Sequence, residues 1–273
     1  MNTITWRVAG LTDRGVVRSH NEDNYTISKD ERVFVVADGM GGTENGALAS
    51  KLAVEELDNY HKANKLNLTD AAALKTWLTE SILRANEVVV QTQAETKQKM
   101  GTTIVAAVQA DNNILHIAHV GDSRAYLVRD GATEVLTSDH SVVMEMVKIG
   151  RLTKEQSKKS PFRHLITRCL GHDPEVISDY LALEVKHGDW IILATDGLSA
   201  VIDEEQIASL MESPKDPEQA CKKLVEETLA GGAPDNVTVV AIHYANSDNS
   251  NSKKVAGEGS LQAKEDAVRS IRK

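Results

Sequence analysis

The most informative segment of the chain reads Val35-Val36-Ala37-Asp38-Gly39-Met40-Gly41-Gly42. It joins a short apolar run of strand-forming residues to an acidic, glycine-rich turn. Two later runs end in the same way, Ala118-His119-Val120-Gly121-Asp122 and Ile192-Leu193-Ala194-Thr195-Asp196-Gly197, and Asp235 directly precedes the run Val237-Thr238-Val239-Val240. If these strands pack side by side, their four aspartates converge on one rim.

Each Asp-Gly pair, taken alone, is also a common turn after a strand. The recurrence of the pattern and the three glycines beside Asp38 favour a binding site instead. Four carboxylates can share a small cleft only if cations offset their repulsion. The ligands on offer are all oxygens, without His or Cys pairs at zinc spacing, so we expect Mg²⁺ or Mn²⁺. Gly39 has no side chain, which would let its carbonyl approach an ion.

Composition limits the remaining classes. The chain has 273 residues, 41% of them apolar and 26% charged, which fits one globular domain with a tail. Its formal net charge of -9 argues against a nucleic-acid partner, since that requires a basic surface. Cys169 and Cys221 suggest neither a disulfide framework nor a sulfur-ligated metal. Without an apolar run of the ~18 residues that a membrane span needs, we expect a cytoplasmic protein.

Periodicity predicts an α+β protein. Val, Ile and Thr dominate short runs at 4–8, 32–37, 102–109, 114–120, 124–128, 177–185, 190–194 and 236–243, which we expect to be strands. Helical patterns lie at 45–61 and 69–92, and Asp216 with Pro217 should begin a helix that ends near Gly231. Short connections between several strand runs favour antiparallel pairing, so we expect helices outside a sheet sandwich.

The domain should end at residue 245. The following run, Asn246-Ser247-Asp248-Asn249-Ser250-Asn251-Ser252, is too polar to bury enough apolar surface to order itself. We therefore expect residues 1–245 to form the domain and 246–273 to be a flexible tail. A short helix over 261–273 would be marginal without a partner.

Six motifs in this order carry a resemblance to a known family: Thr12-Asp13-Arg14-Gly15-Val16-Val17-Arg18-Ser19-His20-Asn21-Glu22-Asp23, Ala37-Asp38-Gly39-Met40-Gly41-Gly42, Gly101-Thr102-Thr103, Gly121-Asp122-Ser123-Arg124, Ala194-Thr195-Asp196-Gly197-Leu198 and Gly232-Ala233-Pro234-Asp235-Asn236-Val237-Thr238. From about residue 5 to 243 the chain resembles the metal-dependent protein phosphatases of type 2C, the PPM family. The resemblance implies a central antiparallel β-sandwich flanked by helices on both sides, in four α-β-β-α layers. It also implies activity on phosphoserine and phosphothreonine with Mn²⁺ or Mg²⁺.

The same resemblance assigns the metal ligands. Asp38 would bridge two ions, Gly39 would offer its carbonyl, and Asp196 and Asp235 would complete the first ion. Asp122 would help to hold a third, weaker ion, as in bacterial relatives. Two ions about 3.5 to 4 Å apart lower the pKa of a shared water and stabilise an in-line displacement, so the chemistry agrees with this ligand set.

Three further residues have roles by resemblance. Glu22 and Asp23 would act through metal-bound waters, and Arg18 would grip the substrate phosphate, since a guanidinium offers bidentate charge to phosphoryl oxygens. Many eukaryotic members have a histidine where this chain has Met40, which cannot donate a proton. Bacterial members commonly share the methionine, so a bacterial origin and a metal-bound water as proton donor are expected.

A basic segment interrupts the acidic chain. Seven basic residues lie between positions 148 and 168 against one acidic residue, Glu155. They form either a solvated helix face or part of a flap beside the active site that attracts acidic or phosphorylated protein segments. The family's variable flap falls here, at about residues 139–172, and its candidate substrate contacts are Lys158, Lys159 and Arg163.

The expected function is a monomeric protein serine/threonine phosphatase that opposes a cytoplasmic Ser/Thr kinase and acts on that kinase's phosphorylated substrates. Two alternatives stay open at the level of sequence. A pseudophosphatase would keep the fold without chemistry, although such proteins usually lose metal aspartates. A phosphatase for a small metabolite is excluded by no residue.

Overall fold

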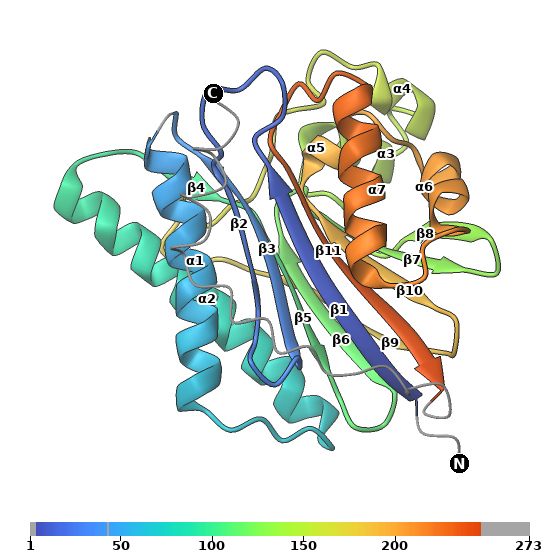
Figure 1. The fold of residues 1–273 in the computed structure, drawn as a ribbon. Helices are drawn as coiled ribbons and strands as arrows, with labels where there is room; N and C mark the ends of the chain where they lie inside the picture. The colour runs from blue at the N-terminus through green and yellow to red at the C-terminus, as the bar shows by residue number, and fades with distance from the viewer. Residues whose placement is uncertain (1–3, 43, 247–273) are drawn as a thin grey trace, which may run out of the picture.

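The computed structural model describes residues 4–42 and 44–246. Over these residues the chain forms two antiparallel sheets that face each other, with helices on both outer sides (Figure 1). One sheet has the order β1-β11-β10-β7-β8, with β1 at Ile4–Asp13, β7 at Arg124–Arg129, β8 at Ala132–Val135, β10 at Trp190–Ala194 and β11 at Val237–Asn246. The other has the order β2-β3-β5-β6-β9, with β4 paired to β3; its strands are β2 Asp23–Ile27, β3 Val33–Met40, β4 Gly101–Thr102, β5 Ile104–Gln109, β6 Ile114–Val120 and β9 Asp179–Glu184.

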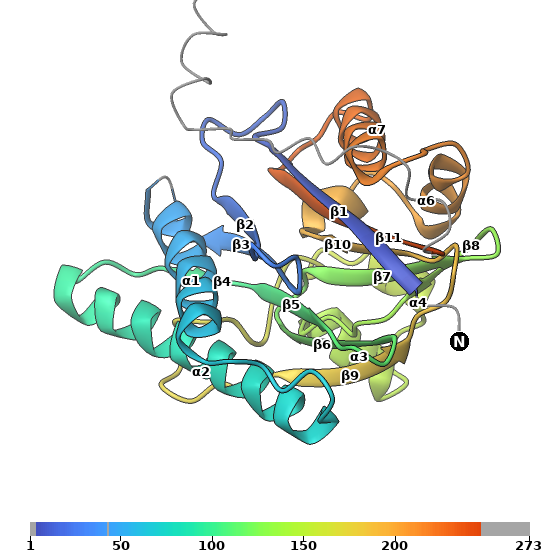
Figure 2. The same ribbon diagram turned by 60° about the horizontal axis from the view of Figure 1, so that its bottom comes forward.

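Two groups of helices form the outer layers. Helices α1 (Glu44–Ala63) and α2 (Ala71–Thr96) cover the sheet that contains β3, and α6 (Glu204–Met211) and α7 (Pro217–Ala230) cover the sheet that contains β11. Figure 2 shows the same four layers from another side. The short helix α5 (Asp196–Ser199) follows β10, and α3 (Val142–Lys148) and α4 (Lys154–Lys158) lie in the predicted flap region. No helix among residues 4–42 and 44–246 is long and apolar enough to cross a membrane.

Side-chain alternation along the strands explains the layers. On β3, Phe34 and Val36 join the core between the two sheets, while Val33, Val35 and Ala37 face the core under α1 and α2. Both faces of this strand are therefore buried, which is why its sequence is a continuous apolar run rather than an alternating one. The predicted four-layer α-β-β-α sandwich is confirmed.

Most predicted elements are found, with shifted ends. The strands at 114–120 and 190–194 have the predicted bounds, and Asp216 caps α7 by accepting from the Gln219 N–H at 2.9 Å. The single strand predicted at 102–109 was wrong, because it breaks at Thr103 into β4 and β5. Strand β11 reaches Asn246, one residue beyond the predicted domain end. The rest of the predicted tail, with its short helix at 261–273, lies outside the described residues.

Candidate metal and phosphate site

The topology brings the four strand-end aspartates to one rim. Asp38 lies near the end of β3, Asp122 follows β6, Asp196 begins α5 after β10, and Asp235 precedes β11. Strands of both sheets thus contribute, and the negative charges of the other three aspartates all act on the Asp38 carboxyl. The convergence expected from the sequence is present.

Burial and mutual repulsion destabilise the ionised form of these carboxyls when no cation is bound. Burial raises the pKa of Asp38 well above its ordinary value, and Asp23, Asp196, Asp122 and Asp235 raise it further. Burial, followed by the charge of Asp196, raises the pKa of Asp122 to about 7. The pKa of Asp196 is also raised, by burial first and by Asp235 next. A set of partly buried carboxylate oxygens that repel one another fits hard divalent cations.

Glu22 and Asp23 lie beside the aspartates. Asp23 pairs with Asp38 across β2 and β3, and its Oδ2 accepts hydrogen bonds of 2.8 Å from both Thr195 and Thr238. Burial raises the pKa of Asp23 to about 7, although these two hydroxyl bonds lower it. Within the described part of the chain, Asp23 Oδ1 and Glu22 Oε1 are buried without a hydrogen-bond partner. Such oxygens fit the predicted role of holding waters on nearby cations.

The backbone at Asp38 is fixed by two threonines. Thr103 Oγ1 accepts from the Asp38 N–H at 3.0 Å, and the Asp38 carbonyl accepts from Thr103 N–H and Thr102 Oγ1, both at 2.9 Å. Thr103 Oγ1 also lies 2.6 Å from Ser123 Oγ, next to Asp122. The Gly101-Thr102-Thr103 motif therefore ties together the turns that carry two of the aspartates.

Gly39 is required by packing as well as by any metal role. A Cβ at this position would lie 2.0 Å from the Gly46 carbonyl of α1 and 2.6 Å from the Glu22 carbonyl. The Gly39 N–H donates to the Glu22 carbonyl at 3.1 Å. Any side chain here would push α1 and the Glu22 loop away from β3, so the residue stays a glycine for a reason that sequence alone did not supply.

Arg18 lies at the edge of the cluster on an exposed loop. Its Nη2 is 2.7 Å from Asp235 Oδ2, and about half of its side chain is exposed. Asn236 holds this loop: its Nδ2 donates to the carbonyls of Arg14 and His20, both at 2.8 Å, and its Oδ1 accepts from the Glu22 N–H at 2.8 Å. The site predictions from sequence omitted Asn236, although it stands directly after Asp235 in the last motif.

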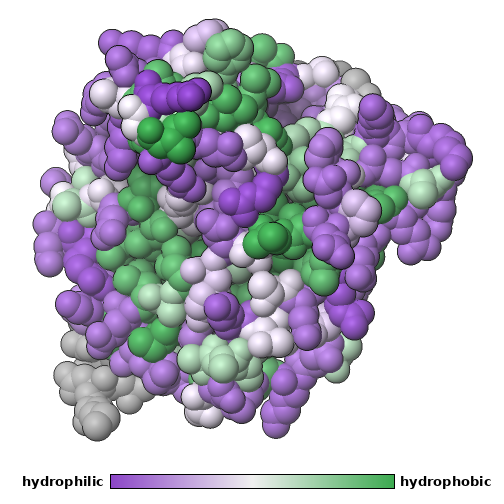
Figure 3. Space-filling view, turned by 180° about the vertical axis from the view of Figure 1, so that it is seen from behind, coloured by the Kyte–Doolittle hydropathy of each residue, from purple (hydrophilic) through white to green (hydrophobic). Residues whose placement is uncertain are grey.

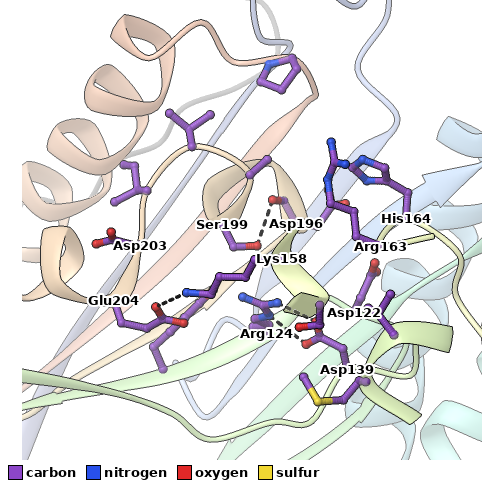
Figure 4. A pocket seen from close by; sticks show the side chains of 18 of the residues that line it. Asp122, Arg124, Asp139, Lys158, Arg163, His164, Asp196, Ser199, Asp203 and Glu204 are labelled. Atoms are coloured by element: carbon purple, nitrogen blue, oxygen red, sulfur yellow. Dashed lines mark hydrogen bonds and ion pairs between the residues drawn. The ribbon is translucent and has the colours of Figure 1, made fainter. Parts of the chain in front are cut away.

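The flap covers a cleft of about 480 Å³ that continues from Asp122 and Asp196. Figure 4 shows Lys158, Arg163 and His164 around this cleft, with Lys158 Nζ 3.2 Å from Glu204 Oε2. Lys159 is exposed and lies outside the cleft lining. Two of the three predicted flap contacts thus line the cleft, and His164, which sequence analysis missed, acts electrostatically on Asp196.

The basic segment does not form a single helix face, and some of its basic side chains form ion pairs. Lys158 contacts Glu204, and Arg168 Nη1 lies 2.9 Å from Asp179 Oδ1. The segment also exposes the apolar side chains of Ile149 and Phe162. The surface seen from behind carries apolar patches bordered by polar side chains (Figure 3).

Partly buried carboxylates that favour cations, beside a guanidinium that can hold phosphate, define a metal-dependent phosphatase. The chain belongs to the protein phosphatase 2C family, whose sequence profile matches residues 15–231.

Named relatives agree with this membership. The chain is 35% identical over 236 residues to the serine/threonine phosphatase stp of Listeria innocua, covering 85% of this chain and 93% of that protein. It is similar to the structure of Stp1 from Staphylococcus aureus, with a TM-score of 0.82, 31% identity and coverage of 88% of this chain and 95% of that one. It is also similar to the catalytic domain of the phosphatase PstP in complex with two manganese ions, with a TM-score of 0.78, 35% identity and coverage of 89% and 100%.

Proposed function

We propose that this chain is a protein serine/threonine phosphatase that hydrolyses phosphoserine and phosphothreonine with Mn²⁺ or Mg²⁺. The observation that carries the proposal is the cluster of partly buried aspartates, in which burial first and the neighbouring carboxylates next raise the pKa values of Asp38, Asp122 and Asp196. Similarity to named serine/threonine phosphatases, one of them solved with two manganese ions, supports it. Asp38, Asp196 and Asp235, with the Gly39 carbonyl, would hold two ions, and Asp122 would help to hold a third.

The bound ions supply Lewis acidity and a water of lowered pKa. The residues of the chain position the metal ligands and bind the phosphate. Hydrogen bonds with Thr102 and Thr103 hold the backbone of Asp38 in place. The hydroxyls of Thr195 and Thr238 fix the orientation of the Asp23 carboxylate. Arg18, at the exposed edge, can exchange its contact with Asp235 for the phosphoryl oxygens of a substrate.

The direct test is hydrolysis of a phosphothreonine peptide with Mn²⁺ and with EDTA, alongside a phosphotyrosine peptide and a small sugar phosphate. We expect hydrolysis of the phosphothreonine peptide with Mn²⁺ and none with EDTA. Preference for the sugar phosphate would instead support a metabolite phosphatase. The monomeric state, the cytoplasmic location, the partner kinase and the domain boundaries stay predictions.

Arg18→Ala should raise the KM for a phosphopeptide on the order of 10-fold while changing kcat less, because a charge-assisted contact to the ground-state phosphate is lost. Steady-state kinetics at saturating Mn²⁺ measure both constants. Arg14→Ala is the matched control, since Arg14 lies on the same loop and contacts the Ser19 carbonyl at 3.4 Å. An unchanged KM in Arg18→Ala, or an equal increase in both variants, would remove Arg18 from the site.

Replacing Lys158, Lys159 and Arg163 with Gln should slow the turnover of an acidic phosphoprotein roughly 3- to 10-fold at low salt, because the segment's positive charge attracts the substrate. Hydrolysis of p-nitrophenyl phosphate should hardly change. Added salt should shrink the defect, since screening removes what the substitutions remove. The charge-matched control replaces Lys51, Lys62 and Lys222, exposed lysines of α1 and α7, with Gln. Equal losses on both substrates would indicate damage to the cleft rather than lost attraction.

A further inference from the structure

A pair of buried histidines next to Asp122 takes no part in the function proposed above. His119 lies at the end of β6, and His140 lies where the chain enters the flap; both are almost fully buried. Their rings stack with centroids 4.7 Å apart and an interplanar angle of 20°. His119 Nε2 lies 3.1 Å from the Ser138 carbonyl, so this nitrogen carries the ring proton of a neutral His119.

His140 contacts the backbone of Gly121 at two points. Its ring Nδ1 accepts from the Gly121 N–H at 3.1 Å, and its own N–H donates to the Gly121 carbonyl at 3.0 Å. Gly121 has a φ of +105°, a conformation in which a residue with a side chain would be strained. The two hydrogen bonds with His140 therefore hold the backbone of Gly121, the residue directly before Asp122.

The environment of His140 fixes which ring nitrogen accepts. Burial first, and the neighbouring His119 and Arg168 next, lower the pKa of His140 to about 4, so the ring is neutral near pH 7. His140 Nε2 lies 3.4 Å from Asp179 Oδ1, and Arg168 Nη1 lies 2.9 Å from the same oxygen. The carboxylate favours the ring proton on Nε2, which leaves Nδ1 free to accept from Gly121.

His140 also joins the flap to this turn. Its carbonyl accepts from the Thr167 N–H at 2.7 Å, and two residues later the Val142 N–H donates to the Leu165 carbonyl at 2.9 Å. The first residues of the flap therefore pair with residues 165–167 near its end. On the far side of Asp122, Ser123 Oγ contacts Thr103 Oγ1. Asp122 is thus bracketed by Ser123 on one side and by the Gly121 contacts on the other.

His119, His140 and Asp179 also bring potential ligand atoms within 4.8 Å of one another. His140 Nε2, which lies 3.4 Å from Asp179 Oδ1, and His119 Nδ1 are both buried without a hydrogen-bond partner among the described residues. A cation between them is disfavoured because the Arg168 guanidinium already neutralises Asp179. The cluster is better explained by the orientation of its neighbours than by a metal of its own.

We propose that His140 is a positioning residue for Asp122: by clamping Gly121 it holds the Asp122 carboxylate in place for the third, weakest cation. The inference rests on the proposed function, because it takes Asp122 as a ligand of that ion. It extends that function by placing the base of the flap in direct contact with the metal site.

The test compares two substitutions that differ in the atom they keep. In His140→Asn the side-chain oxygen can take the place of Nδ1 and accept from Gly121, whereas His140→Gln places its amide near the position of Nε2 and lacks that acceptor. Free Mn²⁺ measured by electron paramagnetic resonance during a titration gives the number of bound ions and their affinity classes. His116→Gln is the control, because His116 is equally buried on β6 but contacts Tyr180 instead.

We expect His140→Gln to weaken the weakest Mn²⁺ class on the order of 10-fold, as substitutions behind a metal ligand commonly do, and to leave the tighter classes unchanged. His140→Asn should restore most of that affinity, and His116→Gln should match the unmodified protein. Unchanged binding in His140→Gln, equal weakening of all classes, or failure of His140→Asn to restore binding would each overturn the proposal.

Melting curves in EDTA establish that each variant folds. If His140→Gln does not, Asp179→Asn carries the test, since Asp179 is partly exposed and acts on the ring through its charge. This variant should weaken the third class in the same direction but by less, and unchanged binding would overturn the proposal. An unmodified protein that binds only two ions, yet hydrolyses phosphopeptide, would overturn this inference and leave the proposed function standing.

Discussion

Asp38→Ala is expected to lower kcat for a phosphothreonine peptide by roughly 10³-fold or more. Losses of about this size follow when a group that stabilises the transition state electrostatically is removed. The reason is the proposed bridging position of Asp38. Asp38 is partly buried, and burial together with the charges of Asp23, Asp196, Asp122 and Asp235 raises the pKa of its carboxyl. Removing it would take one ligand from two ions and leave the other carboxylates without those ions.

The loss should be one of chemistry and not of folding. Because Asp38 is repelled by its neighbours, its removal should leave the melting temperature in EDTA unchanged or raise it. Asp111→Ala is the control: Asp111 lies just beyond β5 and contacts Arg32 at 2.9 Å, outside the aspartate cluster. Full activity of Asp38→Ala at saturating Mn²⁺ would exclude the bridging role.

The main strands could be predicted because burial on both faces gives continuous apolar runs. The apolar residues from Val33 to Ala37 and from Trp190 to Ala194 are all buried, and an aspartate of the cluster follows each run within two residues. Strand β2 was missed because it begins with Asp23 and Asn24, residues that disfavour strands. The Asp23 carboxylate accepts hydrogen bonds from Thr195, directly after β10, and from Thr238 on β11, and no local sequence pattern shows these tertiary contacts.

The supporting residues of the site were harder to find than its aspartates. Asn236 and His140 hold backbone groups that are far away in sequence, and hydrogen bonds of that kind leave no periodic signal. The charge pattern identified the basic segment but could not show that Lys158 contacts Glu204 while Lys159 lies outside the cleft lining. Local patterns show which runs form the main strands, and only the fold shows which side chains meet at their ends.

The second large effect concerns the stability of the protein without metal. In EDTA, the melting temperature should fall as the pH rises from about 4 to about 7. Burial raises the pKa of Asp23 and of Asp122 from 3.8 to about 7. A carboxyl whose pKa is higher in the folded protein stabilises the fold while protonated, and that contribution is lost as the pH passes through the folded value.

The size of the effect follows from the shifts. Each unit of raised pKa corresponds to about 1.4 kcal/mol once the group is ionised. Since the carboxyls titrate together, we expect a total loss of folding free energy on the order of 5 kcal/mol. For a domain of this size that is about 10–20 °C in melting temperature, measurable by calorimetry or circular dichroism over a series of buffers.

Asp23→Asn separates this effect from ordinary acid and base denaturation, because an amide oxygen can still accept from Thr195 and Thr238 but carries no charge. Its melting temperature in EDTA should vary less with pH than that of the unmodified protein, and should be higher above pH 7. Saturating Mn²⁺ should stabilise the unmodified protein most at high pH and little near pH 5, since the ions bind ionised carboxylates and compete with protons. Two results would contradict this account: a melting temperature in EDTA that stays level or rises across this range, or a slope in Asp23→Asn as steep as in the unmodified protein. Either would show that folding does not raise the pKa values of these carboxyls. The cluster would then have no electrostatic need for cations, and the strongest physical argument for a metal site at this rim would be lost.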